Sequence, residues 1–230
     1  MARQRIGLIV PSSNTVMEPD LHRSFPDSAV ISTTRIFLEE VTRKAERRMI
    51  RQDLLQALRL IKTTKPQIVV FGCTSAGSLG GLRQDDAIAR TVERKTGSQA
   101  VTVLGAVLLQ LHSIRPRRIA MFTPYIDDLT NAVARSLIEA GFSIAKAVGM
   151  GIRDNRRIGA TTPGEIASFV ESRMLNISAD CVFLSCTNWQ AQAAIPLLQK
   201  RLNLPVLSSN QSVVNAVGIA LGIALQHAPH

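Results

Sequence analysis

The chain contains an internal repeat, which constrains its fold more than any other feature of its 230 residues. Residues 6–11 (IGLIVP) resemble residues 119–124 (IAMFTP), and residues 69–75 (VVFGCTS) resemble residues 182–188 (VFLSCTN). In both cases the second copy lies 113 positions after the first, and two matches at one separation indicate a duplicated unit. Each copy has an apolar run followed by a short polar segment. The sequence therefore predicts two similar lobes.

Short apolar runs alternate along the chain with longer segments of helical periodicity. This alternation favours parallel sheets covered by helices on both faces, because parallel strands need crossover connections. The predicted fold class is therefore α/β, with two lobes related by a pseudo-twofold axis; residues 1–105 plus 208–230 form the first and residues 106–207 the second. We expect strands at 5–10, 29–36, 67–72, 101–104, 117–123, 142–149, 180–185 and 205–207, and helices at 16–24, 43–63, 84–96, 106–114, 126–140, 163–176, 190–202 and 210–226.

The repeat also predicts where a site would lie. In open parallel sheets, ligands bind beyond the carboxyl ends of the strands. Pro11 and Cys73 follow strands of the first lobe, and Pro124 and Cys186 follow the matching strands of the second. If the lobes face each other, Cys73 and Cys186 meet across one cleft. We therefore expect the active site in that cleft.

The two repeated cysteines are the predicted catalytic residues. Cys73 opens a segment in which backbone N–H groups and the hydroxyls of Thr74 and Ser75 can hold a carboxylate and lower the thiol pKa. Cys186 has a similar setting with Thr187. With two facing thiols, one can attack or deprotonate a carbon beside a carboxylate while the other transfers a proton on the opposite face. Cys181, inside an apolar strand, is instead expected to be a packing residue.

Other polar residues at the strand ends have two interpretations. Ser12 and Asn14 precede a helix, so they can form a turn and helix cap, and the same helix N-terminus can bind an anion. Tyr125 follows the equivalent strand of the second lobe and is either a half-buried core phenol or a site residue. The charged segment 153–157 is either a solvated loop or a means of attracting an acidic substrate.

The net charge of +10 admits a nucleic-acid partner, a pocket for an anionic substrate or a solvated basic surface. Arg43, Arg47 and Arg51 recur at helical spacing on one expected outward face, with Glu46 nearby. One Trp and one Tyr provide little base stacking, so nucleic-acid binding is disfavoured.

Cysteine and histidine usage and the apolar runs set further expectations. Three cysteines without a CxxC spacing and four scattered histidines predict neither a disulfide framework nor a metal site. The apolar runs are too short for a membrane helix or a signal peptide, so the cytoplasm is expected and a membrane partner is not.

Five short motifs carry a resemblance to a known family: residues 6–15 (IGLIVPSSNT), 72–74 (GCT), 123–128 (TPYIDD), 154–155 (DN) and 184–186 (LSC). They resemble motifs of the aspartate/glutamate racemase superfamily, with the maleate cis–trans isomerase branch as the most similar and arylmalonate decarboxylase also similar. The resemblance implies flavodoxin-like lobes, a reaction without a cofactor and a small carboxylate substrate; we also expect a homo-oligomer.

The resemblance also implies roles for individual residues. Cys73 would be the nucleophile and Cys186 its acid/base partner, while Asn14, Tyr125 and Asn155 would hold the substrate carboxylates. The residues after the first cysteine are more similar to the decarboxylase, which however has glycine in place of that cysteine. Two thiols favour isomerisation or racemisation over decarboxylation. Together with the PSSNT motif they lead to the hypothesis of a cis–trans isomerase of a small unsaturated dicarboxylate, with a two-cysteine racemase, a decarboxylase-like enzyme and a non-catalytic anion-binding protein as alternatives.

Overall fold

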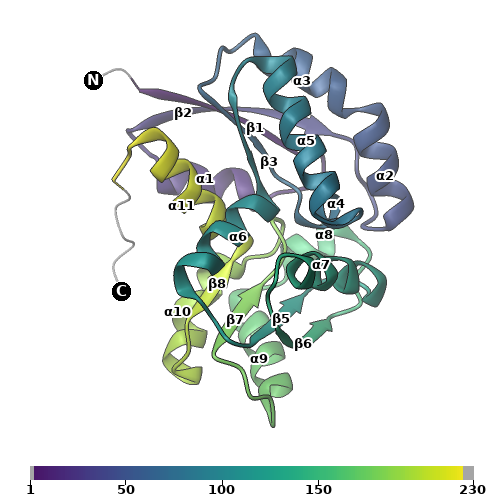
Figure 1. The fold of residues 1–230 in the computed structure, drawn as a ribbon, viewed down its shortest axis with the longest axis vertical. Coiled ribbons are helices and arrows are strands. Elements are labelled where there is room, and N and C mark those ends of the chain that lie inside the picture. The colour runs from purple at the N-terminus through teal and green to yellow at the C-terminus, as the bar shows by residue number, and fades with distance from the viewer. Residues whose placement is uncertain (1–2, 225–230) are drawn as a thin grey trace.

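A computed structural model describes residues 3–224, which form two lobes with one four-stranded parallel sheet each (Figure 1). The strand order is β2-β1-β3-β4 in the first lobe and β6-β5-β7-β8 in the second. The two orders are equivalent, so the predicted α/β class with two similar lobes is confirmed, and a strand is present at each of the eight expected places. The strands are β1 (Gln4–Pro11), β2 (Ala29–Ile36), β3 (Ile68–Phe71), β4 (Gln99–Thr102), β5 (Ile119–Thr123), β6 (Ile144–Gly149), β7 (Cys181–Leu184) and β8 (Val206–Ser208).

The helices agree with the expected ones in most places. They are α1 (Met17–Ser24), α2 (Arg43–Gln52), α3 (Leu54–Lys62), α4 (Thr74–Ser78), α5 (Gly81–Thr96), α6 (Val103–Ile114), α7 (Asp127–Glu139), α8 (Asn155–Ala160), α9 (Pro163–Met174), α10 (Ala191–Leu202) and α11 (Ser209–Leu221). None of the helices between residues 3 and 224 is both long enough and apolar enough to cross a membrane.

The helices differ from the expected ones in four places. The helix expected at 43–63 is divided at Asp53 into α2 and α3, although the backbone of Asp53 stays in the right-handed helical region with φ −105° and ψ −25°. Strand β4 ends and α6 begins earlier than expected, because Thr102 caps the helix by accepting a hydrogen bond from the Gly105 amide. Helices α4 and α8 are short and were expected to be loops. The helix expected at 210–226 ends at Leu221, and residues 225 and 226 lie outside the described range.

The apolar strands of the first sheet are buried on both faces. Along β1, Ile6, Leu8 and Val10 belong to one core cluster and Ile9 to another, because successive side chains point to opposite faces of a strand. The second cluster packs under α2, α3 and α5. The first cluster continues into the second lobe and includes all of β7. One core therefore joins the two sheets.

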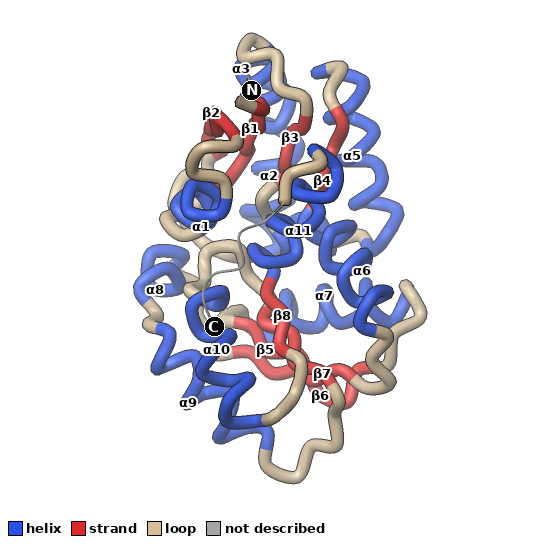
Figure 2. Tube along the Cα trace, turned by 90° about the vertical axis from the view of Figure 1, so that its left-hand side faces the viewer, coloured by secondary structure: helices blue, strands red, loops and turns tan. Residues whose placement is uncertain are grey.

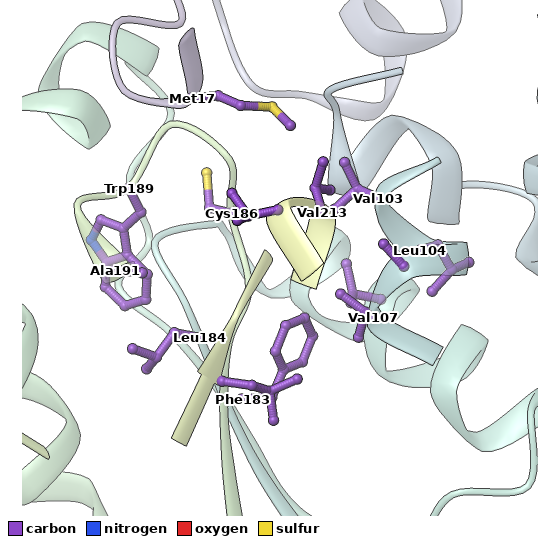
Figure 3. Packing of buried hydrophobic residues seen from close by; sticks show 14 of the residues in the cluster. Met17, Val103, Leu104, Val107, Phe183, Leu184, Cys186, Trp189, Ala191 and Val213 are labelled. Atoms are coloured by element: carbon purple, nitrogen blue, oxygen red, sulfur yellow. The ribbon is translucent and has the colours of Figure 1, made fainter. Parts of the chain in front are cut away.

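Helices α6 and α11 meet at the centre of the molecule (Figure 2). Val103, Leu104 and Val107 of α6 lie around Val213 of α11, and Phe183 of β7 lies beside them (Figure 3). Each helix follows the last strand of its lobe, yet α11 also packs against α1 and β4 of the first lobe. The lobe boundaries at 105 and 208 stay a prediction.

Candidate active site

A small pocket lies between the lobes, at the carboxyl ends of the strands. Its unfilled space is about 10 Å³, roughly the space of one water molecule. Its walls come from the segments that follow β1, β3, β5 and β7, from α2 and the residues before it, and from the start of α8. The lining residues are Pro11, Asn14, Leu38, Val41, Glu46, Cys73, Ser75, Tyr125, Asn155, Cys186, Thr187 and Asn188.

The structure brings most of the sequence-predicted site residues together here. Both predicted cysteines line the pocket, as do Asn14, Ser75, Tyr125, Asn155 and Thr187. Ser12 and Thr74 lie outside it. The Ser12 hydroxyl accepts a hydrogen bond from the Leu38 amide at 3.1 Å, and the Thr74 hydroxyl donates to Ser209 Oγ at 3.1 Å. These two hydroxyls therefore anchor the elements around the pocket.

Cys73 is the residue that precedes α4, so its thiol lies beside the first backbone amides of that helix. Burial raises the pKa of the Cys73 thiol well above its usual value, and the charge of Glu46 raises it further. The Ala76 amide acts in the opposite direction by hydrogen bonding. The Cys73 Sγ atom lies 4.0 Å from Ser75 Oγ. Ser75 therefore supplies a hydroxyl in contact with this thiol.

Cys186 lies in the equivalent segment after β7 and is surrounded by donors. Its Sγ atom accepts a hydrogen bond from the Asn188 amide at 3.3 Å. The Tyr125 hydroxyl and the Trp189 amide also hydrogen-bond to this thiol, and both lower its pKa. Burial is the larger effect and raises the pKa of Cys186 to about 12. The three donors offset only part of the effect of burial, so the thiol stays the favoured form at this position.

Asn14 connects the two lobes at the pocket. Its Oδ1 atom accepts from the Val16 and Met17 amides at 3.1 and 3.0 Å and so caps the start of α1. Its Nδ2 group donates to Thr187 Oγ1 at 3.1 Å, and this hydroxyl donates to the Gly72 carbonyl at 3.0 Å. An amide group has two N–H donors, so Asn14 has a second one for a ligand.

Asn155 and Asn188 form a second connection between the lobes. Asn155 Nδ2 donates to Ser13 Oγ at 2.8 Å, and Asn188 Nδ2 donates to Asn155 Oδ1 at 3.0 Å. The Thr15 amide donates to Asn188 Oδ1 at 2.8 Å. Asn155 begins α8, so the segment 153–157 is not a simple solvated loop: its third residue is buried at the pocket.

Glu46 is a pocket residue that the sequence analysis missed. It was placed near the outward charged face of a helix, but its side chain is 0% exposed. Its Oε1 atom accepts a hydrogen bond from the Ser75 hydroxyl, and its Oε2 atom has no partner among the described residues. Burial raises the pKa of Glu46 to about 8, although the hydrogen bond from Ser75 and the positive charge of Arg43 act to lower it. Helical spacing could have revealed it, because Met49 and Ile50, three and four residues later, both pack in the core.

The basic residues of α2 do not line the pocket. Arg47 and Arg51 are exposed as predicted, but Arg43 is partly buried and pairs with Asp128 of α7, with Nε 3.0 Å from Oδ2. No Lys, Arg or His of residues 3–224 is among the lining residues. A bound carboxylate would therefore be held by neutral N–H and O–H donors. Cys181 is fully buried in β7, away from the pocket.

Comparison with known proteins adds three findings. The model of a protein family described as arylmalonate decarboxylase matches residues 6–226. Maleate isomerase from Geobacillus stearothermophilus is 27% identical over 225 residues, which cover 91% of this chain and 88% of that protein. Arylmalonate decarboxylase from Bordetella bronchiseptica is 28% identical over 208 residues, which cover 89% and 85%.

A solved structure has the same fold over nearly the whole chain. It is a mutant of Nocardia farcinica maleate cis–trans isomerase with a covalently bound succinylcysteine intermediate. The two structures agree with a TM-score of 0.88 at 21% identity, over 96% of this chain and 94% of that one. At 21% identity, this similarity shows that both lobes have the fold of that structure.

Proposed function

Because this chain belongs to the arylmalonate decarboxylase family, we propose that it is a cofactor-independent cis–trans isomerase of a small unsaturated dicarboxylate. The reaction is of the type that converts maleate to fumarate. Cys73 is the nucleophile and Cys186 is its acid/base partner. The relatives named maleate isomerase support this choice within the family.

One observation carries the proposal: two free cysteines from equivalent positions of the two lobes line one small pocket. A decarboxylase needs one group that delivers a proton to a carbanion. A pocket with two thiols suits a reaction in which one forms a bond to carbon while the other exchanges a proton. The succinylcysteine of the Nocardia farcinica isomerase is an adduct of this kind in a protein of the same fold.

The proposed steps conserve atoms and electrons. The Cys73 thiolate adds to one alkene carbon, and the π electron pair moves to the other carbon, where Cys186 supplies a proton. The carbon–carbon bond is now single and rotates. Cys186 then takes the proton back, the double bond reforms and the thiolate of Cys73 leaves. N–H groups of Asn14 and Asn155 hold the carboxylates and stabilise the charge that develops on them during addition.

Proton NMR with maleate tests this function. We expect fumarate to form with the unmodified protein, and Cys73→Ser to lower the rate by at least about a hundredfold, because a serine hydroxyl is a much weaker nucleophile than a thiolate. Cys181→Ala is the matched control, since this buried cysteine lies outside the pocket, and it should retain turnover. Absence of fumarate with the unmodified protein, or full activity of Cys73→Ser, would refute the proposal.

A racemase of an amino acid is the second candidate, and Glu46 favours it. The Oε2 atom of this buried carboxyl group has no partner among the described residues, and an ammonium group of a substrate would provide one. Two thiols on opposite faces of Cα would then remove and return its proton. Incubation with amino acids in deuterated water separates the two functions: a racemase introduces deuterium at Cα, whereas the isomerase leaves amino acids unlabelled.

A further inference from the structure

One side chain, that of Ser75, connects Cys73 to the buried acid Glu46. The Ser75 hydroxyl donates its hydrogen to Glu46 Oε1, and Ser75 Oγ lies 4.0 Å from the Sγ atom of Cys73. A hydroxyl has one hydrogen to donate. Either atom can be the donor in the contact between sulfur and oxygen. While Ser75 gives its hydrogen to Glu46, the thiol of Cys73 is left as the donor; once Cys73 is a thiolate, Ser75 can donate to it instead, which lowers the pKa of Cys73. In the first of these states the hydrogen bonds therefore run from thiol to hydroxyl to carboxylate.

We propose that Glu46 takes up the thiol proton of Cys73 through the hydroxyl group of Ser75, so that the three side chains form a proton relay. The S–H bond of Cys73 breaks and its proton moves to Ser75 Oγ, while the Ser75 proton moves to Glu46 Oε1. The products are a thiolate and a neutral carboxylic acid. The net charge is unchanged and nothing is oxidised or reduced. Glu46 is thus a positioning residue that acts through Ser75.

The electrostatics of the pocket explain why the relay moves a negative charge from Glu46 to Cys73 and does not leave both groups ionised. An ionised Glu46 raises the pKa of Cys73, so a carboxylate and a thiolate together are unfavourable in this buried space. Cys186 and Tyr125 face the same carboxyl group from the second lobe and provide no positive charge. Arg43, on the same helix, is the cation that acts on Glu46. The pocket therefore tolerates one negative charge, which the relay can place on sulfur.

Within residues 3–224, the second cysteine has no such connection. Cys186 receives hydrogen bonds from Tyr125 and from the Asn188 and Trp189 amides, all of which are donors. The pair formed by Ser75 and Glu46 is thus specific to Cys73. This inference rests on the proposed role of Cys73 as the nucleophile, but it can be measured without any substrate.

The test is the rate at which iodoacetamide alkylates Cys73 in the full-length protein, followed by peptide mass spectrometry from about pH 6 to pH 10. In the unmodified protein the alkylation rate should rise with pH and then level off near the pKa of Glu46. Above that pH, Glu46 and Cys73 together already carry one negative charge, so the fraction of it that lies on Cys73 no longer changes with pH. In Glu46→Gln the rate should keep rising with pH, because a neutral amide cannot share the charge.

Two serine variants test the connecting hydroxyl. Ser75→Ala should lower the plateau about ten- to a hundredfold, the effect of losing one hydrogen bond to a charged group. Ser75→Thr keeps the hydroxyl and should restore most of the rate. Ser78→Ala is the matched control, because the Ser78 hydroxyl donates to the Thr74 carbonyl within α4 and not to Glu46; its profile should equal that of the unmodified protein.

The outcomes separate the relay from the proposed function. A plateau that persists in Glu46→Gln, or a Ser75→Ala profile equal to that of the unmodified protein, overturns the relay even if maleate is isomerised. The expected profiles without any turnover of maleate support the relay and refute the proposed substrate. The serine variants keep the test valid if Glu46→Gln does not fold.

Discussion

Cys73 and Cys186 occupy equivalent positions in the two lobes, yet their thiols have different neighbours. Two residues after each cysteine, the first lobe has Ser75 and the second has Asn188. Ser75 contacts a buried carboxyl group, whereas the Asn188 amide donates directly to the thiol of Cys186. At the scale of single residues, the surroundings of the two thiols therefore differ because Cys73 contacts the Ser75 side chain next to Glu46, whereas Cys186 accepts from a backbone N–H group.

The buried Glu46 should also make the stability of the protein depend on pH. Its pKa is about 8 in the folded protein against an ordinary value of 4.5, so folding disfavours its ionised form. Its contribution to stability is fully present below about pH 4.5 and is lost as the pH rises to about 8. At pH 7 the loss is at most about 3 kcal/mol.

We expect Glu46→Gln to raise the free energy of unfolding, because the amide fills the same space without a charge. The gain should be larger at pH 8 than at pH 5, where the native carboxyl group is mostly protonated. Urea unfolding at the two pH values measures it. A gain of equal size at both pH values would show that ionisation of Glu46 does not affect stability.

At the scale of elements, α2 and the residues before it form a wall of the pocket that is attached to the second lobe. The Val41 amide donates to the Arg153 carbonyl at 2.9 Å, and Glu40 forms an isolated antiparallel bridge with Asp154. Further along, Arg43 pairs with Asp128. The space inside the pocket is too small for a dicarboxylate, so we expect this wall to move when a ligand enters.

A disulfide across the bridge tests this movement. Glu40 and Asp154 are both exposed, and the Cα atoms of antiparallel partners lie about 4.5–5.5 Å apart, within the range of a disulfide. With Glu40→Cys and Asp154→Cys, oxidation should slow the alkylation of Cys73 at least about tenfold, and reduction should restore it, because opening the wall is a local unfolding step. The two single variants, oxidised in the same way, are controls. Equal rates before and after oxidation would place the entrance elsewhere.

The elements differ in how far the sequence could predict them. Strands such as β3 and β7 are continuous apolar runs, and long helices such as α5 and α7 have a clear period, so both kinds were predictable. The short α4 has no such pattern, because all five of its residues are buried. Its form depends on packing against other elements, which a local pattern does not contain.

At the scale of the whole molecule, the core that joins the two sheets should make the lobes unfold together. Trp189 is the only tryptophan and is fully buried in the second lobe, so its fluorescence reports on that lobe, whereas circular dichroism reports on both. We expect the two signals to change at the same urea concentration. Val213→Ala, at the contact of α6 and α11, should lower both midpoints equally, at a cost of about 2 kcal/mol. Two separate transitions would contradict this expectation.

The overall architecture was the most predictable part, because the repeat at 113 positions fixed two equivalent lobes and the position of both cysteines. The contents of the pocket were less predictable. Asn14, Tyr125 and Asn155 were found through motifs, whereas Glu46 comes from a helix whose charged neighbours suggested a surface position. Which hydroxyl faces the pocket also depends on tertiary contacts, as Thr74 and Ser75 show by pointing to different partners.

The equivalent strand order of the two lobes has a consequence for how such a pocket can evolve. If each lobe were a separate chain and two copies paired, every substitution would occur on both sides of the pocket, and a planar substrate would meet the same groups on both faces. With both lobes in one chain, a mutation changes one face only. The asymmetry between Cys73 with its acid and Cys186 with its donors is therefore available to a fused protein and not to a symmetric dimer of half-chains.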